Sequence, residues 1–533
     1  MTTESEATKH RIIPNYDPHA LWAPVLNRAH RRGEDGPALA ALVEAIVDEH
    51  ARAGIDTIAQ CIFEGFRTPQ LACATADPYD VGDHPIIKGS AELIEILRNV
   101  ESSGRSLVQI LVERCHARSM KFLAGLRMND RHAGSGANWD LWPRVQRMVD
   151  DHPEWELTEF RGALDFKHEG VRDAVLAFIA ETLDTHDVDG LEFDWPRWYH
   201  VFKASEAVAH APRLTDFTRK ARALLDEAAR RRGCDRLTLG VRVAHTLEEC
   251  RFLGYDLAAW IGEGLVDYVA PSDFFHTDFN APVEQFVALT AKAGGACKVY
   301  PSIHVKLAWD DSANKVTRAH CRAAARNFYA AGAHGLSPYN YQEFWGGMWG
   351  ETDQDGALSL REPLSTLAQL RDDAAIAAED RHYVYLPLWG GGATEGHGPT
   401  GGYHNDRILL DCREGRPQGA YTFRIAEDLS DPSLSATLSF KVTSLIETDE
   451  LQVQINGAAI PASAIERTWH IGQSPKEGRP LGRYFQYRMD LICPPAQEGE
   501  NTLTLRVTHV AGMPSRVLNA QEFEVFVKVG ASR

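Results

Sequence analysis

The sequence lacks the features of exported, membrane-spanning and disulfide-bonded proteins. Its first ten residues, MTTESEATKH, contain two glutamates and no apolar core of the kind that marks a secretory signal. No run of about eighteen apolar residues occurs in the chain, so we expect no membrane association. The nine cysteines are widely spaced and form no CxxC pair, which argues against a disulfide framework or a zinc site. A cytoplasmic protein with reduced thiols is the simplest interpretation.

Positive charge is scarce relative to negative charge. The chain has 56 Lys and Arg residues against 74 Asp and Glu residues, a net charge of −18. Such a surface repels a phosphate backbone on average, so nucleic acid is not an expected partner. The 533 residues are 44% hydrophobic and 24% charged, which excludes a disordered chain and allows two to four globular domains.

The first part of the chain alternates short β-rich apolar runs with longer amphipathic helices such as 36–54 and 171–186. This alternation is typical of an α/β fold, in which helices wrap a parallel sheet. Eight such runs predict a (β/α)8 TIM barrel over residues 1–350, with its functional residues on the loops that follow the strands. The runs are 11–17, 56–65, 121–130, 188–195, 237–244, 267–273, 298–305 and 335–341.

The pattern changes after residue 350. Helical periodicity persists only through a connecting segment, 351–379, and then gives way to alternating segments such as ATLSFKVTSL and NTLTLRVTHV. We therefore predict a C-terminal all-β sandwich domain over residues 380–533. Three roles are open for it: it binds carbohydrate, covers the barrel mouth or builds a homo-oligomer.

The segment VDGLEFDWPRWYH (188–200) is the most informative for chemistry. A buried barrel strand should be apolar, yet this one carries Asp189, Glu192 and Asp194. Because side chains alternate along a strand, Glu192 and Asp194 face the same way, with Cα atoms ~6.6 Å apart, into the barrel mouth. Glycosidic bond cleavage needs such a pair, one carboxyl protonated and one ionised. Asp189 has the opposite parity and is expected to be structural.

A second polar segment, GLRMNDRH (125–132), closes the third strand. Arg127 and Asn129 are interpreted as sharing one face, where they orient substrate and hold a carboxylate ionised. For Asp130, substrate binding and capping of the following loop are equally open. In a structural alternative to catalysis, Arg127 and Arg197 form a cluster of ion pairs with the two carboxylates.

Further candidate site residues follow the other predicted strands. The polar ones would bind the hydroxyls of a sugar, and the aromatic ones would pack against the face of its ring. The polar candidates are Asp17, Asp273, His276, His304, Asn340, Tyr341 and Glu343. The aromatic candidates are Trp195, Trp198, Phe274, Phe275, Tyr339 and Trp345, of which we interpret Trp198 and Phe274 as core.

Several motifs resemble the family-10-like glycosyl hydrolase barrels over about residues 10 to 345. They are RMNDRH, LDFKHEGVRD (164–173), VDGLEFDWPRW and PYNY, and such proteins often also carry a β-rich tail. DGLEFDWP also resembles the chitinase strand motif, but Pro196 stands where chitinases have their catalytic glutamate, and the seventh strand lacks the carboxylate of retaining β-glycosidases. The layout is similar to that of α-galactosidase-like barrels, which implies Asp194 as nucleophile and Asp273 as acid/base.

We therefore expect a glycoside hydrolase that needs no cofactor or metal and acts on an oligosaccharide or small glycoside. Asp194 is the expected nucleophile or base, and Glu192 and Asp273 compete for the role of general acid. The absence of a signal favours imported small glycosides. The expected substrate-binding residues are Arg127, Asn129, Asp130, Trp195, Arg197, His276, Asn340, Tyr341 and Glu343.

Two other classes stay open. A metal-dependent TIM-barrel sugar isomerase would use Glu192, Asp194, Asp130 and His276 as ligands, although no close metal-ligand spacing supports it. A non-catalytic carbohydrate-binding protein would keep the aromatic and polar groups and lack turnover.

Overall fold

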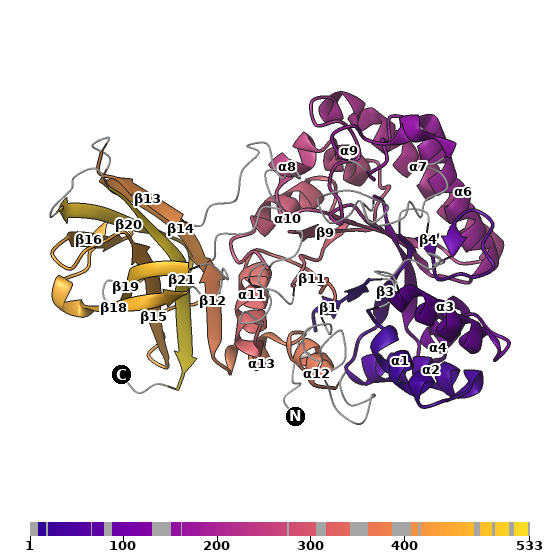
Figure 1. Ribbon diagram of the computed structural model, residues 1–533, viewed down its shortest axis with the longest axis horizontal. Helices are drawn as coiled ribbons and strands as arrows, with labels where there is room; N and C mark the ends of the chain where they lie inside the picture. The colour runs from indigo at the N-terminus through magenta and orange to yellow at the C-terminus, as the bar shows by residue number, and fades with distance from the viewer. Residues whose placement is uncertain are drawn as a thin grey trace.

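The computed structural model contains an α/β part and an all-β part side by side, joined through α11, α12 and α13 (Figure 1). It describes residues 9–17, 20–64, 67–78, 88–129, 151–160, 162–273, 277–304, 307, 316–341, 361–385, 407–413, 417–473, 480–492, 496–510 and 516–530. Each of the eight predicted apolar runs contains a strand that pairs in parallel with its neighbour. No helix in the described ranges is long and apolar enough to cross a membrane.

Seven parallel strands form a curled half-barrel sheet. In spatial order they are β2 (Asn15–Tyr16), β3 (Thr57–Glu64), β6 (Lys121–Arg127), β7 (Gly190–Asp194), β8 (Thr238–Ala244), β9 (Tyr268–Ser272) and β10 (Lys298–Val299). The short strands β4 (Arg67–Thr68) and β5 (Asp77–Pro78) extend the sheet from β3. The curl brings Asn15 on β2 into hydrogen-bond contact with Glu192 on β7, three strands away.

The strands do not close into one continuous ring of eight. Instead β1 (Arg11–Ile12) and β11 (Gly335–Leu336) form a separate parallel pair. Single bridges tie Tyr339 to Asn15 and to His304, and the backbone N–H of Tyr339 donates to the carbonyl of Ile303 at 3.0 Å. The half-barrel and the strand pair are therefore linked by isolated backbone contacts in place of the predicted closed barrel.

Helices cover the outer face of the curled sheet (Figure 1). Alternation along β7 explains this packing, because Phe193 points outward and its ring lies 5.6 Å from that of Phe217 on a covering helix, whereas Glu192 and Asp194 point inward. The described residues contain these helices, of which α12 and α13 belong to the segment that leads to the all-β part: α1 (Ala23–Arg31), α2 (Gly36–Arg52), α3 (Lys88–Glu101), α4 (Leu107–Ala117), α6 (Glu169–Thr185), α7 (Ala207–Arg232), α8 (Leu247–Phe252), α9 (Leu257–Gly262), α10 (Val283–Lys292), α11 (Arg318–Ala330), α12 (Arg361–Gln369) and α13 (Asp373–Ala377).

The all-β part consists of two antiparallel sheets. One contains β12 (Arg381–Tyr385), β13 (Arg407–Asp411), β15 (Leu434–Thr443), β18 (Ile465–Gln473), β19 (Pro480–Asp490) and β21 (Val517–Val529). The other contains β14 (Gln418–Ile425), β16 (Glu450–Ile455), β17 (Ala458–Ala459) and β20 (Gly499–His509). The sheets contact each other through buried rings, with Tyr421 stacked on Phe523 at 4.6 Å.

Polar contacts join the two parts of the molecule. His320 Nε2 on α11 lies 2.7 Å from His382 Nδ1 on β12. Asn280, which precedes α10, donates to the hydroxyl of Tyr421 at 2.8 Å. The α/β part is therefore in direct contact with both sheets of the all-β part. All eight cysteines in the described ranges are free thiols.

Candidate active site

Four charged side chains stand side by side at the carboxyl ends of neighbouring strands. In the register of the parallel sheet, Glu64 on β3 lies next to Arg127 on β6, followed by Asp194 on β7 and Arg242 on β8. Asp17, at the end of the first strand segment, joins them through Arg127. We refer to these five residues as the charged layer. Opposite charges alternate along the layer, so each buried charge has a partner.

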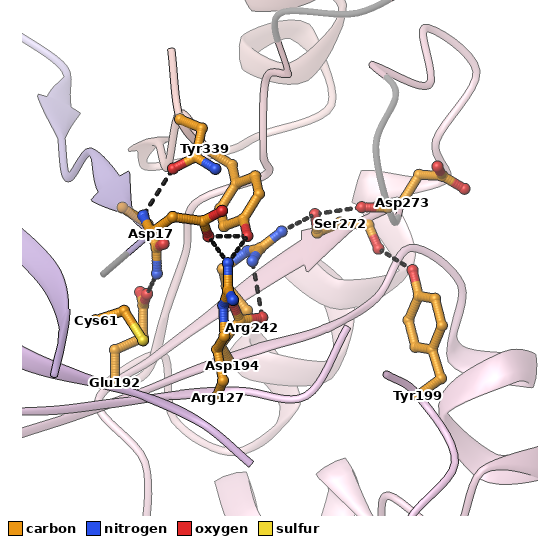
Figure 2. A network of polar contacts seen from close by, with 12 residues as sticks. Asp17, Cys61, Arg127, Glu192, Asp194, Tyr199, Arg242, Ser272, Asp273 and Tyr339 are labelled. Atoms are coloured by element: carbon orange, nitrogen blue, oxygen red, sulfur yellow. Dashed lines mark hydrogen bonds and ion pairs between the residues drawn. The ribbon is translucent and has the colours of Figure 1, made fainter. Parts of the chain in front are cut away.

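Asp194 is held on one side by Arg242. Arg242 Nη1 donates to Asp194 Oδ1 at 2.7 Å, and Nη2 donates to Ser272 Oγ at 2.7 Å (Figure 2). The guanidinium of Arg242 also stacks on the ring of Tyr339 at 4.0 Å. Burial raises the pKa of the Asp194 carboxyl, while the charges of Arg242 and Arg127 oppose that effect. Among the described residues, Oδ2 of Asp194 has no hydrogen-bond partner.

Arg127 connects three side chains at the other end of the layer. It forms ion pairs with Asp17 and Glu64, and its Nη2 lies 3.4 Å from the hydroxyl of Tyr339. That hydroxyl in turn donates to Asp17 Oδ1. Burial alone would raise the pKa of Asp17, but the charges of Arg127 and Arg197 hold it below its usual range. Asp17 is therefore an ionised carboxylate at neutral pH.

Glu192 lies one step deeper than the charged layer. Its oxygens accept hydrogen bonds from Asn15 and, at 2.5 Å, from the hydroxyl of Tyr268. Burial raises the pKa of Glu192 to about 7. Beneath it the sheet interior is apolar, with Ile13 and Leu123 among the buried residues of that cluster. Glu192 is thus a carboxyl at the boundary between the polar mouth and the apolar base.

Asp273 belongs to a second buried cluster beside the charged layer. His245 Nδ1 lies 3.3 Å from Glu249 Oε2 and 3.9 Å from Asp273 Oδ2, and His245 Nε2 lies 3.5 Å from Asp278 Oδ2. In Figure 2 Asp273 is connected to the charged layer through Ser272. The hydroxyl of Ser272 donates to the backbone carbonyl of Asp273 at 2.7 Å and accepts a hydrogen bond from Arg242. The carboxyl of Asp273 points away from Asp194 in the same view.

Several predicted residues meet at the charged layer. Arg127 and Asp194 are part of it, and the charge of Arg197 acts on Asp17 and Asp194. Asn340 Oδ1 accepts the backbone N–H of Asp17 at 2.7 Å. The structural alternative named Arg127 and Arg197 as partners of the paired carboxylates, but the direct partner of Asp194 is Arg242.

Other predicted residues lie apart from the charged layer. The amide of Asn129 bonds to the backbone of Leu164 and His200. Trp195 is fully buried in an aromatic cluster on the outer side of β7. The hydroxyl of Tyr341 lies 3.4 Å from Cys321 Sγ beneath α11. Asp189, expected to be structural, accepts the backbone N–H of Phe122 at 2.8 Å, which confirms that expectation.

Three predicted site residues, Asp130, His276 and Glu343, lie outside the described residues, as do Phe274, Phe275 and Trp345. The sequence interpretation missed Glu64, Arg242, Ser272, Asn15 and Tyr268 as members of the site. Arg242 carries the signal that singled out Asp194, because it is a charged residue within an otherwise apolar strand. Strand parity predicts the contacts of Asn15 and Tyr268 with Glu192 only when the curl of the sheet is also known.

The described residues contain no group of three or more histidine, cysteine, aspartate or glutamate side chains placed to hold a metal ion. Of the four ligands in the isomerase alternative, Glu192 has both oxygens bonded to Asn15 and Tyr268, and Asp194 is paired with Arg242. The other two, Asp130 and His276, lie outside the described residues.

No protein-family model and no curated protein matches the chain. A maltogenic α-amylase, AmyB from Thermotoga neapolitana, is 14% identical with a TM-score of 0.36, over 94% of this chain and 99% of that one. The glycoside hydrolase domain of PgaB (BpsB) from Bordetella bronchiseptica is 9% identical with a TM-score of 0.39, over 68% and 99%. An endo-1,4-β-mannanase from Rhizomucor miehei is 10% identical with a TM-score of 0.39, over 69% and 97%. All three TM-scores are below 0.5, and the resemblance to family-10-like barrels lies in the sequence motifs.

Proposed function

We propose that the protein is a glycoside hydrolase that cleaves an oligosaccharide or small glycoside at the mouth formed by the carboxyl ends of its parallel strands. The observation that carries the proposal is Asp194. It is a buried carboxylate on a barrel-type strand, it is fixed by Arg242 through one oxygen, and its other oxygen has no partner in the described part of the chain. The pairing with Arg242 offsets the cost of burying this carboxylate, and the oxygen that is left without a partner is the one that a catalytic role would use.

The proposed architecture is a (β/α)8 barrel followed by a β-sandwich, over the domain ranges predicted from the sequence. The isolated backbone bridges from Tyr339 to Asn15 and to His304 link the strand pair to both ends of the half-barrel, and this partial closure supports the proposed architecture. The stacked pair Tyr421 and Phe523 supports the sandwich. A cytoplasmic setting and a homo-oligomer stay predictions.

In the proposed mechanism Asp194 attacks the anomeric carbon as nucleophile or activates the attacking water as base. A second carboxyl donates a proton to the glycosidic oxygen as its bond to that carbon breaks. Asp273 and Glu192 compete for that second role. Both oxygens of Glu192 are bonded within the sheet and lie below the charged layer, whereas Asp273 follows β9 at the level of the mouth. A pKa of about 7 for Glu192 suits a general acid, which keeps it as the competing candidate.

The test is hydrolysis in ¹⁸O-labelled water. The purified protein is incubated with 4-nitrophenyl α- and β-glycosides and with short oligosaccharides, and products are read by mass spectrometry. The proposal expects cleavage of at least one glycoside, with label in the newly formed hydroxyl of the sugar. An aldose–ketose interconversion that is lost on chelation would favour the isomerase alternative. Saturable binding without any product would favour a carbohydrate-binding protein.

A further inference from the structure

Asp17 is the most open carboxylate of the charged layer. Its side chain is 16% exposed, compared with 7% for Glu64 and 4% for Asp194. Both hydrogen-bonding contacts of its carboxyl group, from Arg127 and from Tyr339, end on Oδ1 (Figure 2). Within the described ranges, Oδ2 has no hydrogen-bond partner. One oxygen of Asp17 is therefore used to hold the group, and the other is available to a molecule at the mouth.

The backbone of Asp17 is fixed as firmly as its carboxyl group. Its N–H donates to Asn340 Oδ1 at 2.7 Å, and its carbonyl accepts from Gln60 Nε2 at 2.9 Å. Asn340 has a φ of 46°, a left-handed conformation that few residues other than glycine adopt readily. The backbone N–H of Asn340 donates to Asn15 at 2.9 Å, which ties this turn to the first strand. Such tethering places Oδ2 in advance and lowers the entropy cost of binding.

The charge of Asp17 defines what it can bind. Since Arg127 and Arg197 hold the pKa of Asp17 below its usual range in spite of burial, its free oxygen accepts hydrogen bonds and donates none. A sugar hydroxyl is a matching donor. A carboxylate or sulfate group on the sugar would be repelled at this position.

We propose that Asp17 contacts the substrate, and that its Oδ2 accepts a hydrogen bond from a ring hydroxyl of a neutral sugar. The contact makes Asp17 a specificity residue, because a sugar that lacks that hydroxyl, or bears an acidic group there, loses the bond. This inference rests on the proposed glycosidase function and adds the substrate class, a neutral glycoside, to it. Arg197, predicted from the sequence to bind substrate, acts in this proposal through its charge, which helps to keep Asp17 ionised.

The test is a double-mutant cycle between protein and substrate. Wild-type protein and Asp17→Asn are assayed with the best neutral 4-nitrophenyl glycoside and with its 2-, 3-, 4- and 6-deoxy analogues. For one position, deletion of the hydroxyl lowers kcat/KM of the wild type roughly ten- to hundred-fold, as expected for a hydrogen bond to a charged group. The same deletion has little further effect in Asp17→Asn. Asp216→Asn, an exposed aspartate on α7, is the matched control and keeps the wild-type pattern.

The outcomes separate the two hypotheses. Equal penalties for every deoxy analogue in wild type and Asp17→Asn overturn the contact and leave the glycosidase function standing. Hydrolysis of no neutral glycoside by the wild type overturns both. If Asp17→Asn does not fold, Asp17→Glu, which keeps the negative charge beside Arg127 but moves the carboxylate from its place, replaces it in the same cycle. A corresponding 4-nitrophenyl glucuronide hydrolysed by wild type as fast as the neutral glycoside contradicts the proposed substrate class.

Discussion

The hydroxyl of Tyr268 on β9 lies 2.5 Å from Glu192 Oε2 on β7 and reaches it across the intervening strand. Gly240 on β8 is the register neighbour of both residues. A side chain at Gly240 would occupy the space through which Tyr268 passes, because a Cβ there would lie 2.0 Å from Cζ of the tyrosine ring. This glycine therefore makes the bond to Glu192 sterically possible.

Gly240→Ala tests this relationship. We expect it to destabilise the protein by about 1–3 kcal/mol, because the rigid ring of Tyr268 has to move within a packed interior. Urea unfolding of Gly240→Ala and of Gly262→Ala, whose added Cβ meets nothing within 4 Å, provides the comparison. Equal stability of the two variants would contradict the steric role of Gly240.

The raised pKa of Glu192 predicts how the stability of the protein depends on pH. Its pKa rises from an ordinary value of 4.5 to about 7 in the folded protein, so the folded state favours the protonated carboxyl. The stabilisation is complete below about pH 4.5 and is lost as the pH rises through about 7, with a magnitude on the order of 3 kcal/mol. Glu192→Gln, which stays neutral, should remove this component.

The measurement is the free energy of unfolding of wild type and Glu192→Gln from about pH 5 to pH 8. We expect the free energy of unfolding of Glu192→Gln to rise relative to that of the wild type as the pH increases. A difference between the two proteins that stays constant over that range would show that Glu192 does not titrate there.

Because Asp194 pairs with Arg242, we expect Asp194→Asn to lower the stability of the protein as well as its activity. Both side chains are buried, so removing the carboxylate charge leaves Arg242 without its 2.7 Å partner. We expect Asp194→Asn to lose about 3–5 kcal/mol of stability, and the double variant Asp194→Asn with Arg242→Met to recover part of it. Thermal and urea unfolding check both expectations. A single variant as stable as the wild type would mean that the ion pair contributes nothing net.

Much of the strand arrangement could be predicted from sequence, since apolar period and parity are local properties. Glu192 and Asp194 share the inner face as alternation requires. Alternation fails where a strand ends. Strand β6 ends at Arg127, so Asn129, two residues later, does not share its face and bonds to a neighbouring loop instead. Trp195 has the parity of Phe193, and the structure accordingly places both in the outer aromatic cluster.

The composition of the charged layer could not be predicted from single strands. Its pairs join residues that are far apart in sequence, such as Asp17 with Arg127 and Asp194 with Arg242. The pKa values of Asp17 and Asp194 depend on these partners, because burial raises both while the neighbouring guanidinium groups differ. The downward shift of the pKa of Asp17 could therefore be predicted only from the three-dimensional arrangement.

The most direct test of the proposed function is the turnover of Asp194→Asn on the glycoside that the wild type hydrolyses best. It is measured at a temperature at which unfolding curves show both proteins to be folded. Asparagine keeps the shape of the side chain and removes its charge, so we predict that kcat/KM falls by roughly a thousand-fold or more, as when an essential nucleophile or base is lost. Turnover by Asp194→Asn close to that of the wild type would contradict the assignment of Asp194 to the reaction.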